Sequence, residues 1–293
     1  MADSKNSTLF AKSYPRGSQS FYNLVRTQVT SALAEDIGTG DLTAALIKAD
    51  SVAQATIISR ESAIICGQDW VNACFMQLDK DVQIKWLVSE GEYINANQIL
   101  CEISGNARVL LSAERCALNF LQTLSAVATH TNAYVQAIVG TKAQILDTRK
   151  TLPGLRLAEK YAVTVGGGFN QRLALYDGIL IKENHIAAAG SIHAALKHAF
   201  QHNPNTSIQI EVENLDELQQ ALVAGATSIL LDNFSLDDMC SAVKSSQGKV
   251  LLEASGNVNL ETVREIAETG VDRISIGALT KNIRAIDLSM RIK

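Results

Sequence analysis

The sequence lacks the features that define several common classes of protein. It has only three prolines in 293 residues, so no proline-rich linker divides it. Its five cysteines form no CxxC pair and show no Cys/His spacing typical of a metal site, so we expect reduced, buried thiols. Its formal net charge is −4, and this lack of a basic excess argues against a nucleic-acid-binding protein.

Membrane and export signals are also missing from the sequence. No apolar run reaches the roughly 18 residues that a membrane-spanning helix needs. The N-terminal stretch MADSKNSTLF has no basic segment followed by an apolar run, as a secretory signal would have. We therefore predict a cytoplasmic protein that binds neither nucleic acid nor membranes. A hydrophobic content of 47% is enough for one large domain or two of ordinary size.

Short apolar runs alternate with helical patterns throughout the second half of the chain. The spacing of about 20 to 35 residues is typical of βα units, whose strands lie parallel. The runs are AQILDT, GILIKEN, SIQIEVEN, TSILLDN, KVLLEASG and DRISIGA. Each ends in polar residues, as the strands of an α/β barrel do at the rim that carries an active site. We favour this barrel over a doubly wound open sheet, because the glycines at 166–168 follow a helical pattern and not a strand.

The first third of the chain has a different pattern. A helix is predicted over residues 21–37, and short strand-like runs follow between residues 53 and 105. Residues 112–139 have the length and the apolar periodicity of a long helix or a helix pair. We interpret this part as an α+β domain.

Charged residues gather where the predicted strands end. Arg149, Lys150 and Lys182 recur at such positions, which favours an anionic ligand over solvated surface charges. Glu211 and Asp232 end neighbouring strands, where they could hold a metal ion or form salt bridges on the rim. The small residues of the last two strand ends would let backbone N–H groups approach a phosphate. These loops span residues 254–257 and 275–278.

Several motifs together resemble one enzyme family. EDIGTGDLT, SAERCALNFLQTLSAVAT, DTRKTLPGLRLAEKYAV, GGGFNQRLALYDGILIKENH, EVEN, LLDNF, EASGNV and ISIGALT occur in the order of the quinolinate phosphoribosyltransferases. The resemblance implies an N-terminal α/β-sandwich domain over residues 1–125, joined by residues 282–293, and an incomplete, open α/β barrel over residues 126–281. It implies transfer of a phosphoribosyl group from phosphoribosyl pyrophosphate to quinolinate, with release of pyrophosphate and CO2.

The resemblance also implies roles for individual residues. Lys150, Lys182, Glu211 and Asp232 would be catalytic, and the two carboxylates would hold Mg²⁺. The residues expected to bind substrates are Arg115, Arg149, Lys150, Thr151, Arg156, Gln171, Arg172, Lys182, Ser255, Gly256, Asn257, Ser275 and Gly277. Arg115 would reach the site of a partner subunit, so we expect a homodimer with shared active sites and leave larger assemblies open.

Two positions depart from the family pattern. The family commonly has histidine at the position of Gln171 and glycine at that of Asn257. Glutamine can hydrogen-bond a carboxylate or a ring nitrogen, but it cannot carry a positive charge. Of two candidate acid–base groups, His185 could line the site, whereas His130 is expected to pack within its helix.

Two rival functions share much of this pattern. One is a sister phosphoribosyltransferase that acts on nicotinate, and the other is a barrel that binds a phosphate ligand without catalysis. A substrate with one carboxylate needs fewer arginines, so Arg115, Arg149 and Arg172 favour the diacid. A simple binding protein would not need Lys150 together with the other charged rim residues.

Overall fold

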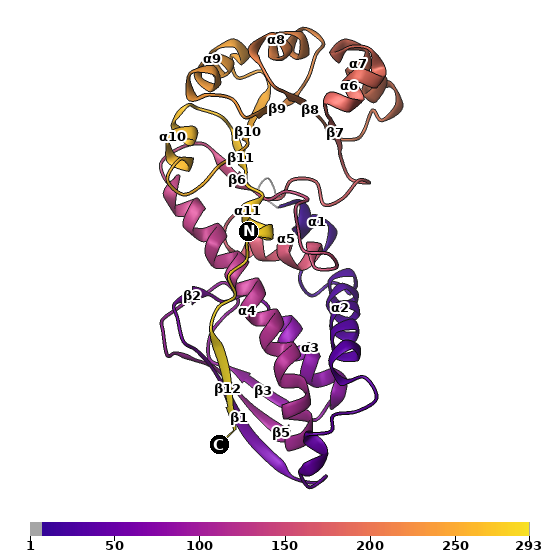
Figure 1. The fold of residues 1–293 in the computed structure, drawn as a ribbon, viewed down its shortest axis with the longest axis vertical. Helices are drawn as coiled ribbons and strands as arrows, with labels where there is room; N and C mark the ends of the chain where they lie inside the picture. The colour runs from indigo at the N-terminus through magenta and orange to yellow at the C-terminus, as the bar shows by residue number, and fades with distance from the viewer. Residues whose placement is uncertain (1–7, 293) are drawn as a thin grey trace. The chain divides into compact units, whose positions relative to one another are not determined.

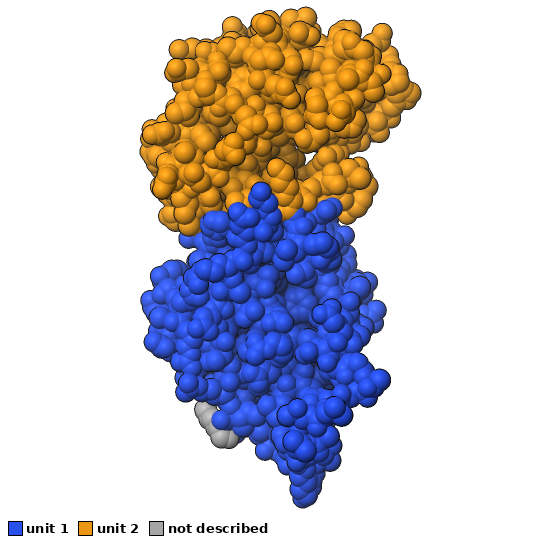
Figure 2. Space-filling model, in the orientation of Figure 1, with its two compact units in different colours: residues 1–132, 151–167, 280–293 blue, residues 133–150, 168–279 orange. Residues whose placement is uncertain are grey.

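The computed structural model describes residues 8–292 and consists of two compact units, coloured separately in Figure 2. The first unit comprises the residues up to 132, residues 151–167 and the residues from 280 on. The second unit comprises residues 133–150 and 168–279. The domain boundaries after residues 125 and 281 remain predictions.

An antiparallel sheet is the centre of the first unit (Figure 1). Its strand order is β12 (Leu288–Ile292), β1 (Val52–Ser59), β5 (Ile99–Asn106) and β3 (Gln83–Trp86). Ala55 in β1 lies opposite Ile292 on one side and Ile103 on the other. The last strand of the chain is therefore an edge strand of a sheet that is otherwise built from the first third. A separate pair joins β2 (Ala63–Ile64) to β4 (Tyr93–Ile94).

The helices of the first unit agree with the predicted pattern. The helix predicted over 21–37 is α2 (Gln19–Ile37). Residues 112–137 of the predicted stretch 112–139 lie in a single helix of 31 residues, α4 (Ala107–Ala137), with no break. The apolar α4 side chains with no exposed surface are Leu110, Ala113, Ala117, Leu121, Leu124 and Ala128. The remaining elements are α1 (Leu9–Ser13), the 3-10 helix η1 (Ala44–Leu46), α3 (Gln68–Leu78), α5 (Arg156–Val165) and α11 (Ala278–Lys281).

The second unit contains the predicted parallel sheet. Its six strands follow the order β6 (Gln144–Leu146), β11 (Arg273–Ser275), β10 (Leu251–Ser255), β9 (Ser228–Asp232), β8 (Ile208–Val212) and β7 (Ile179–Ile181). The helices are α6 (Glu183–Ala189), α7 (Ile192–His202), α8 (Leu215–Val223), α9 (Leu236–Ser246) and α10 (Val263–Glu268). Figure 1 shows α7 to α10 on the outer side of the curved sheet. Strands β6 and β7 are its two edges, so the predicted open α/β barrel is confirmed.

Strand register divides the side chains of this sheet between two faces. Neighbouring partners in a parallel sheet point to the same face, and so do residues two apart in one strand. Glu211 is paired with Leu230, Leu230 with Glu253, and Asp232 with Ser255. These five side chains therefore share one face. The alternating residues on the other face are at most 1% exposed, which fits a face covered by helices: Ile210, Ile229, Leu231, Leu252, Ala254 and Ile274.

Two further expectations from composition can be checked. All five cysteines are free, and four of them are buried, as predicted. Burial raises the pKa of the Cys101 thiol to about 12, so this thiol is a packing residue and not a nucleophile. Within residues 8–292, no helix has both the length and the apolar character needed to cross a membrane.

Candidate active site

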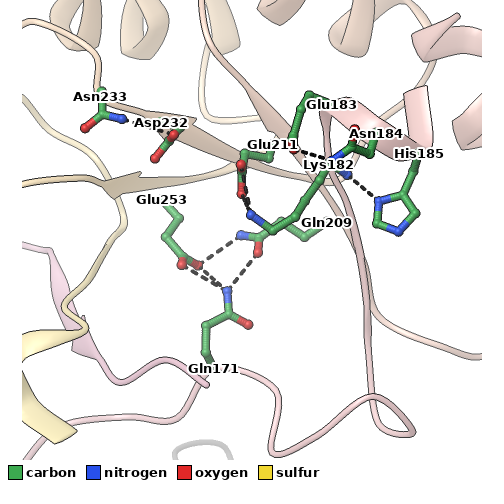
Figure 3. Close-up of polar contacts among 10 residues, drawn as sticks. All are labelled: Gln171, Lys182, Glu183, Asn184, His185, Gln209, Glu211, Asp232, Asn233 and Glu253. Carbon is green, nitrogen blue, oxygen red and sulfur yellow. Dashed lines mark hydrogen bonds and ion pairs between the residues drawn. The ribbon is translucent and has the colours of Figure 1, made fainter. Parts of the chain in front are cut away.

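Polar residues occupy the carboxyl ends of neighbouring parallel strands in the second unit (Figure 3). Asp232, Ser255 and Ser275 are the last residues of β9, β10 and β11, Lys182 follows β7, and Glu211 is the second-last residue of β8. Because the strands are parallel, these ends lie at one edge of the sheet, where α/β barrels place their active sites. The predicted rim is therefore present as a structural unit.

An ion pair joins two of the predicted catalytic residues. Lys182 Nζ lies 2.7 Å from Glu211 Oε2 and 3.0 Å from Oε1. Asp232 is arranged differently, since its Oδ2 accepts a hydrogen bond of 3.1 Å from Asn233 Nδ2. The salt bridge that the sequence left open thus exists for Glu211, while Asp232 has no lysine, arginine or histidine within 4 Å among the residues that the structure describes.

The loop after β10 has a conformation that restricts its residues. Gly256 has φ +104°, and a Cβ added there would lie 2.1 Å from Asn233 Oδ1, so only glycine fits. Asn257 has φ 49°, in the left-handed region that asparagine tolerates better than most residues. Its Nδ2 donates to Asn233 Oδ1 over 3.4 Å. Asn257 therefore keeps a backbone conformation that suits the glycine common in the family.

Two guanidinium groups in this unit, those of Arg149 and Arg172, form no ion pair within 4 Å with an acidic side chain of residues 8–292. The Nε of Arg149 is buried and has no hydrogen-bond partner among the described residues. Burial, followed by the neighbouring Arg149, lowers the pKa of Arg172, and the charge of Asp177 offsets part of this effect. Two like charges held together in this way favour the binding of an anion between them.

Lys150 lies beside the loop that follows β11. A Cβ added to Gly277 would come within 3.0 Å of Lys150 Cδ, so the two residues are in van der Waals contact. The backbone N–H of Lys150 donates to Thr148 Oγ1 over 3.0 Å. The structure thus brings a predicted catalytic lysine next to a predicted phosphate-binding glycine.

A hydrogen-bonded group of three side chains on this face includes two residues that were not among the predicted site residues. Gln171 Nε2 lies 2.7 Å from Gln209 Oε1 and 2.9 Å from both carboxylate oxygens of Glu253 (Figure 3). Gln209 Nε2 also donates to Glu253, over 2.9 Å. The two-residue periodicity of strands could have identified Gln209 and Glu253 from the sequence. Gln209 precedes Glu211 by two residues and Glu253 precedes Ser255 by two, so each shares a face with a predicted site residue.

Three predicted substrate-binding residues belong to the other unit. Thr151 and Arg156 lie in the first unit, where Arg156 Nε donates to Thr151 Oγ1 over 3.1 Å. Arg115 is exposed on α4 in the same unit. Their roles remain predictions, as do those of the other site residues.

The two histidines singled out in the sequence have different surroundings. His185 Nδ1 accepts a hydrogen bond of 3.0 Å from the backbone N–H of Lys182 and so fixes the start of α6. His130 lies in α4, where burial lowers its pKa. His185 is therefore attached to the rim through the backbone of a predicted catalytic residue.

The donor set for a metal ion is small. Within residues 8–292 there is no group of three or more His, Cys, Asp or Glu side chains that could hold one. Glu211 and Asp232, on one face of adjacent strands, could supply two carboxylates. Mg²⁺ is commonly held by one or two carboxylates together with substrate phosphates and water. The residues present fit an ion that arrives with a phosphorylated substrate.

Comparisons with known proteins identify the family. The families described as quinolinate phosphoribosyl transferase, N-terminal domain and C-terminal domain, match residues 41–125 and 127–291. The probable nicotinate-nucleotide pyrophosphorylase (carboxylating) of Bacillus subtilis is 41% identical over 259 residues, which are 88% of this chain and 90% of that one. The nicotinate-nucleotide pyrophosphorylase structure from Francisella tularensis has a TM-score of 0.90 and 50% identity, and covers 93% of this chain and 97% of its own. The chain belongs to the quinolinate phosphoribosyltransferase family.

Proposed function

We propose that the strand-end rim of the second unit is where this chain performs the reaction of its family. The reaction is transfer of the phosphoribosyl group from phosphoribosyl pyrophosphate to quinolinate with decarboxylation, which yields nicotinate mononucleotide, pyrophosphate and CO2 for NAD biosynthesis. One observation is the main support for this location of the active site. Arg149 and Arg172 are held as neighbours, and the Arg149 Nε is buried without a partner. A dianion such as quinolinate supplies what this pair lacks.

The quinolinate end of the site would be built from arginines. A guanidinium group can bind a carboxylate through two parallel hydrogen bonds, so Arg149 and Arg172 suit the two adjacent carboxylates of quinolinate. Arg115 of a partner subunit would supply a third guanidinium. The carboxylates of quinolinate would then neutralise the like charges of Arg149 and Arg172, which repel each other in the absence of substrate.

The phosphoribosyl end would use the carboxylates and the glycine loops. Glu211 and Asp232 would engage the ribose hydroxyls and hold the divalent ion, which we expect to be Mg²⁺. When bound, that ion neutralises charge on the pyrophosphate group. The 5′-phosphate would lie against the loops that contain Gly256 and Gly277, with Lys150 beside the second loop.

The chemistry then follows from holding the two anions in line. The ring nitrogen of quinolinate attacks C1 of the ribose as the C1–O bond to pyrophosphate breaks, through a transition state with oxocarbenium character. Glu211 and Asp232 stabilise the positive charge that develops on the ribose, while Lys150 and Lys182 stabilise the departing pyrophosphate. The ring nitrogen is now positively charged, so it stabilises the electron pair that stays on C2 as the C2–carboxylate bond breaks and CO2 leaves. C2 then takes up a proton from solvent, which gives nicotinate mononucleotide.

The assembly and surroundings of the enzyme are part of the proposal. We expect a homodimer in which each active site uses Arg115 from the other subunit. The domains would comprise residues 1–125 with 282–293, and residues 126–281. We expect the enzyme to work in the cytoplasm.

A ligand comparison tests the function against its two rivals. The purified chain would be titrated calorimetrically with quinolinate and with nicotinate, and CO2 release would be followed in the presence of phosphoribosyl pyrophosphate. Quinolinate-dependent CO2 release with weak nicotinate binding is expected. Preference for nicotinate without CO2 would point to the sister transferase, and binding without turnover would point to a non-catalytic barrel.

A further inference from the structure

Glu253 is a carboxylate in an unusual environment. It has no exposed surface, and no lysine, arginine or histidine of residues 8–292 lies within ion-pair distance. Its hydrogen-bond donors are two carboxamides, Gln171 Nε2 at 2.9 Å and Gln209 Nε2 at 2.9 Å (Figure 3). Burying a carboxylate is costly unless its oxygens are well supplied with donors. A buried carboxylate held by two carboxamides therefore suggests a specific role for Glu253.

The three side chains fix the orientation of the Gln171 carboxamide. One side of its Nε2 faces Gln209 Oε1 at 2.7 Å, and the other faces Glu253. Its Oε1 accepts the backbone N–H of Arg172 over 2.9 Å. Turning the amide over would place its oxygen against a carboxylate and its NH2 group against an N–H donor. The observed orientation is therefore the favourable one.

This orientation determines what Gln171 can do for a substrate. Both of its N–H donors already point to protein acceptors, so it has none left for a substrate carboxylate. What it does hold is the backbone of Arg172. A second buried carboxylate supports the same segment, since Asp147 Oδ1 accepts the Gln171 backbone N–H at 2.9 Å and Oδ2 accepts Asn170 Nδ2 at 2.7 Å.

Arg172 needs such support because of its neighbour. Arg149 repels it, and its own Nη1 is anchored by one hydrogen bond of 3.1 Å to the carbonyl of Gly178. A repelled side chain on a loosely held backbone would move away from its partner. Two guanidinium groups can act on one dianion only if they stay together.

We propose that Glu253 and Gln209 are positioning residues for the diacid substrate, acting through the carboxamide of Gln171 on Arg172. The role rests on the proposed function and adds to it. In this role Gln171 holds the backbone of Arg172 and does not donate a hydrogen bond to quinolinate. The binding of phosphoribosyl pyrophosphate does not depend on this group of side chains.

The test uses a substitution that keeps shape and changes hydrogen bonding. Glu253→Gln places an NH2 group where Gln171 already presents its own, so the carboxamide of Gln171 loses its fixed orientation. We expect the KM for quinolinate to rise by about tenfold or more. The kcat and the KM for phosphoribosyl pyrophosphate should stay within about threefold of wild type. Gln209→Met removes one acceptor of the Gln171 carboxamide, together with the hydrogen bonds that Gln209 Nε2 donates to Glu253 and Ser228. Because Glu253 still accepts from Gln171, the KM for quinolinate should rise by a smaller factor.

A rescue variant separates positioning from general damage. In Glu253→Gln/Gln209→Glu the carboxylate moves to the other partner of Gln171, so the number of donors and acceptors is restored. Its KM for quinolinate should return to within about threefold of wild type. Glu265→Gln on the exposed face of α10 is the matched control and should change nothing. Melting temperatures are measured for every variant, and kinetics are run well below the lowest of them.

The outcomes distinguish this role from the function itself. A wild-type chain that releases no CO2 from quinolinate would overturn both. An active wild type with an unchanged quinolinate KM in Glu253→Gln and Gln209→Met would overturn the positioning role alone. So would a double variant as impaired as Glu253→Gln, because a restored hydrogen-bond pattern would then have no effect.

Discussion

The ammonium group of Lys182 contacts both carboxylate oxygens of Glu211, at 2.7 and 3.0 Å. The Glu211 side chain is 11% exposed and that of Lys182 is 43% exposed, so the lysine reaches solvent while the carboxylate is largely shielded. The two residues come from adjacent strand ends, and each neutralises the other before a substrate arrives. A polyanionic substrate can recruit Lys182 from the open side.

Removal of Lys182 should break its ion pair with Glu211 and weaken the use of phosphoribosyl pyrophosphate. In Lys182→Met, Glu211 loses its charged partner, and the loss of one charge-assisted hydrogen bond is worth about 1.5–3 kcal/mol. We expect kcat/KM for phosphoribosyl pyrophosphate to fall by about 10- to 200-fold in steady-state assays. Lys197→Met, at an exposed position of α7, is the control. Equal activity of the two variants would remove Lys182 from the site.

Arg149 should contribute to quinolinate affinity through the shape of its guanidinium group as well as through its charge. We expect Arg149→Ala to weaken quinolinate binding by about 2–4 kcal/mol in calorimetric titration, the scale for leaving a charged partner unpaired. Arg149→Lys keeps the charge but loses the planar fork, so its affinity should lie between those of wild type and the alanine variant. Affinity unchanged within about threefold in Arg149→Ala would place this residue outside the pocket.

Removal of the divalent metal ion should stop turnover but leave quinolinate binding intact. The described residues offer two carboxylates and no larger cluster, so the ion should depend on substrate phosphates for its remaining ligands. We expect a chelator to abolish turnover while calorimetry still detects quinolinate binding, and added Mg²⁺ to restore activity. Full turnover in excess chelator would contradict the role of Glu211 and Asp232 as metal ligands.

Mixed dimers test whether active sites are shared. Arg115→Ala and Lys182→Ala chains should each be nearly inactive alone. In a mixed dimer, one site would collect both lesions and the other would receive an intact set of residues. Random mixing of equal amounts makes about half of the dimers mixed, so activity should recover to roughly a quarter of wild type.

Subunit exchange must be shown for this experiment, by copurification of differently tagged chains. Exchange without any recovery of activity would mean that Arg115 serves its own subunit or no site at all. Two Lys182→Ala chains carrying the two tags are the control, because they give no intact site in any combination.

Stability in acid should depend on Glu61 in the first unit. Its carboxylate pairs with Arg284 and accepts the backbone N–H of Asp287 over 2.8 Å. Arg284, followed by the Asp287 N–H, lowers the pKa of Glu61 below its ordinary value of 4.5. A lowered pKa in the folded state adds stability above pH 4.5, and this contribution is lost as the pH falls through the folded value.

Urea unfolding of Glu61→Gln measures this contribution. Because Arg284 is 80% exposed, we expect a loss of only about 1 kcal/mol at pH 7. The difference from wild type should shrink as the pH falls below the ordinary value. Glu265→Gln should show no such pH dependence, and an equal loss for Glu61→Gln at pH 7 and pH 3 would contradict the assignment.

The sequence by itself determined the elements and the location of the rim. The apolar run of SILLD is continuous because the parallel sheet buries it on both faces, whereas IQIEV alternates, with Gln209 and Glu211 on the face that carries the site. Strand ends could be found from the polar residues that follow each run, so Lys182, Glu211 and Asp232 were placed correctly at the rim. These are local properties, carried by residues close together in the chain.

Only the tertiary structure decided which side chains meet. Gln171, Gln209 and Glu253 are separated by at least 38 residues. The register of β8, β9 and β10 places Gln209 and Glu253 on one face, and Gln171 reaches them there from outside the strands. The same holds for Lys182 with Glu211, and for β12, which pairs with β1 from the other end of the chain. Periodicity gives the face on which a side chain lies. Its partner depends on strand order and register, and these are set by the packing of the whole unit.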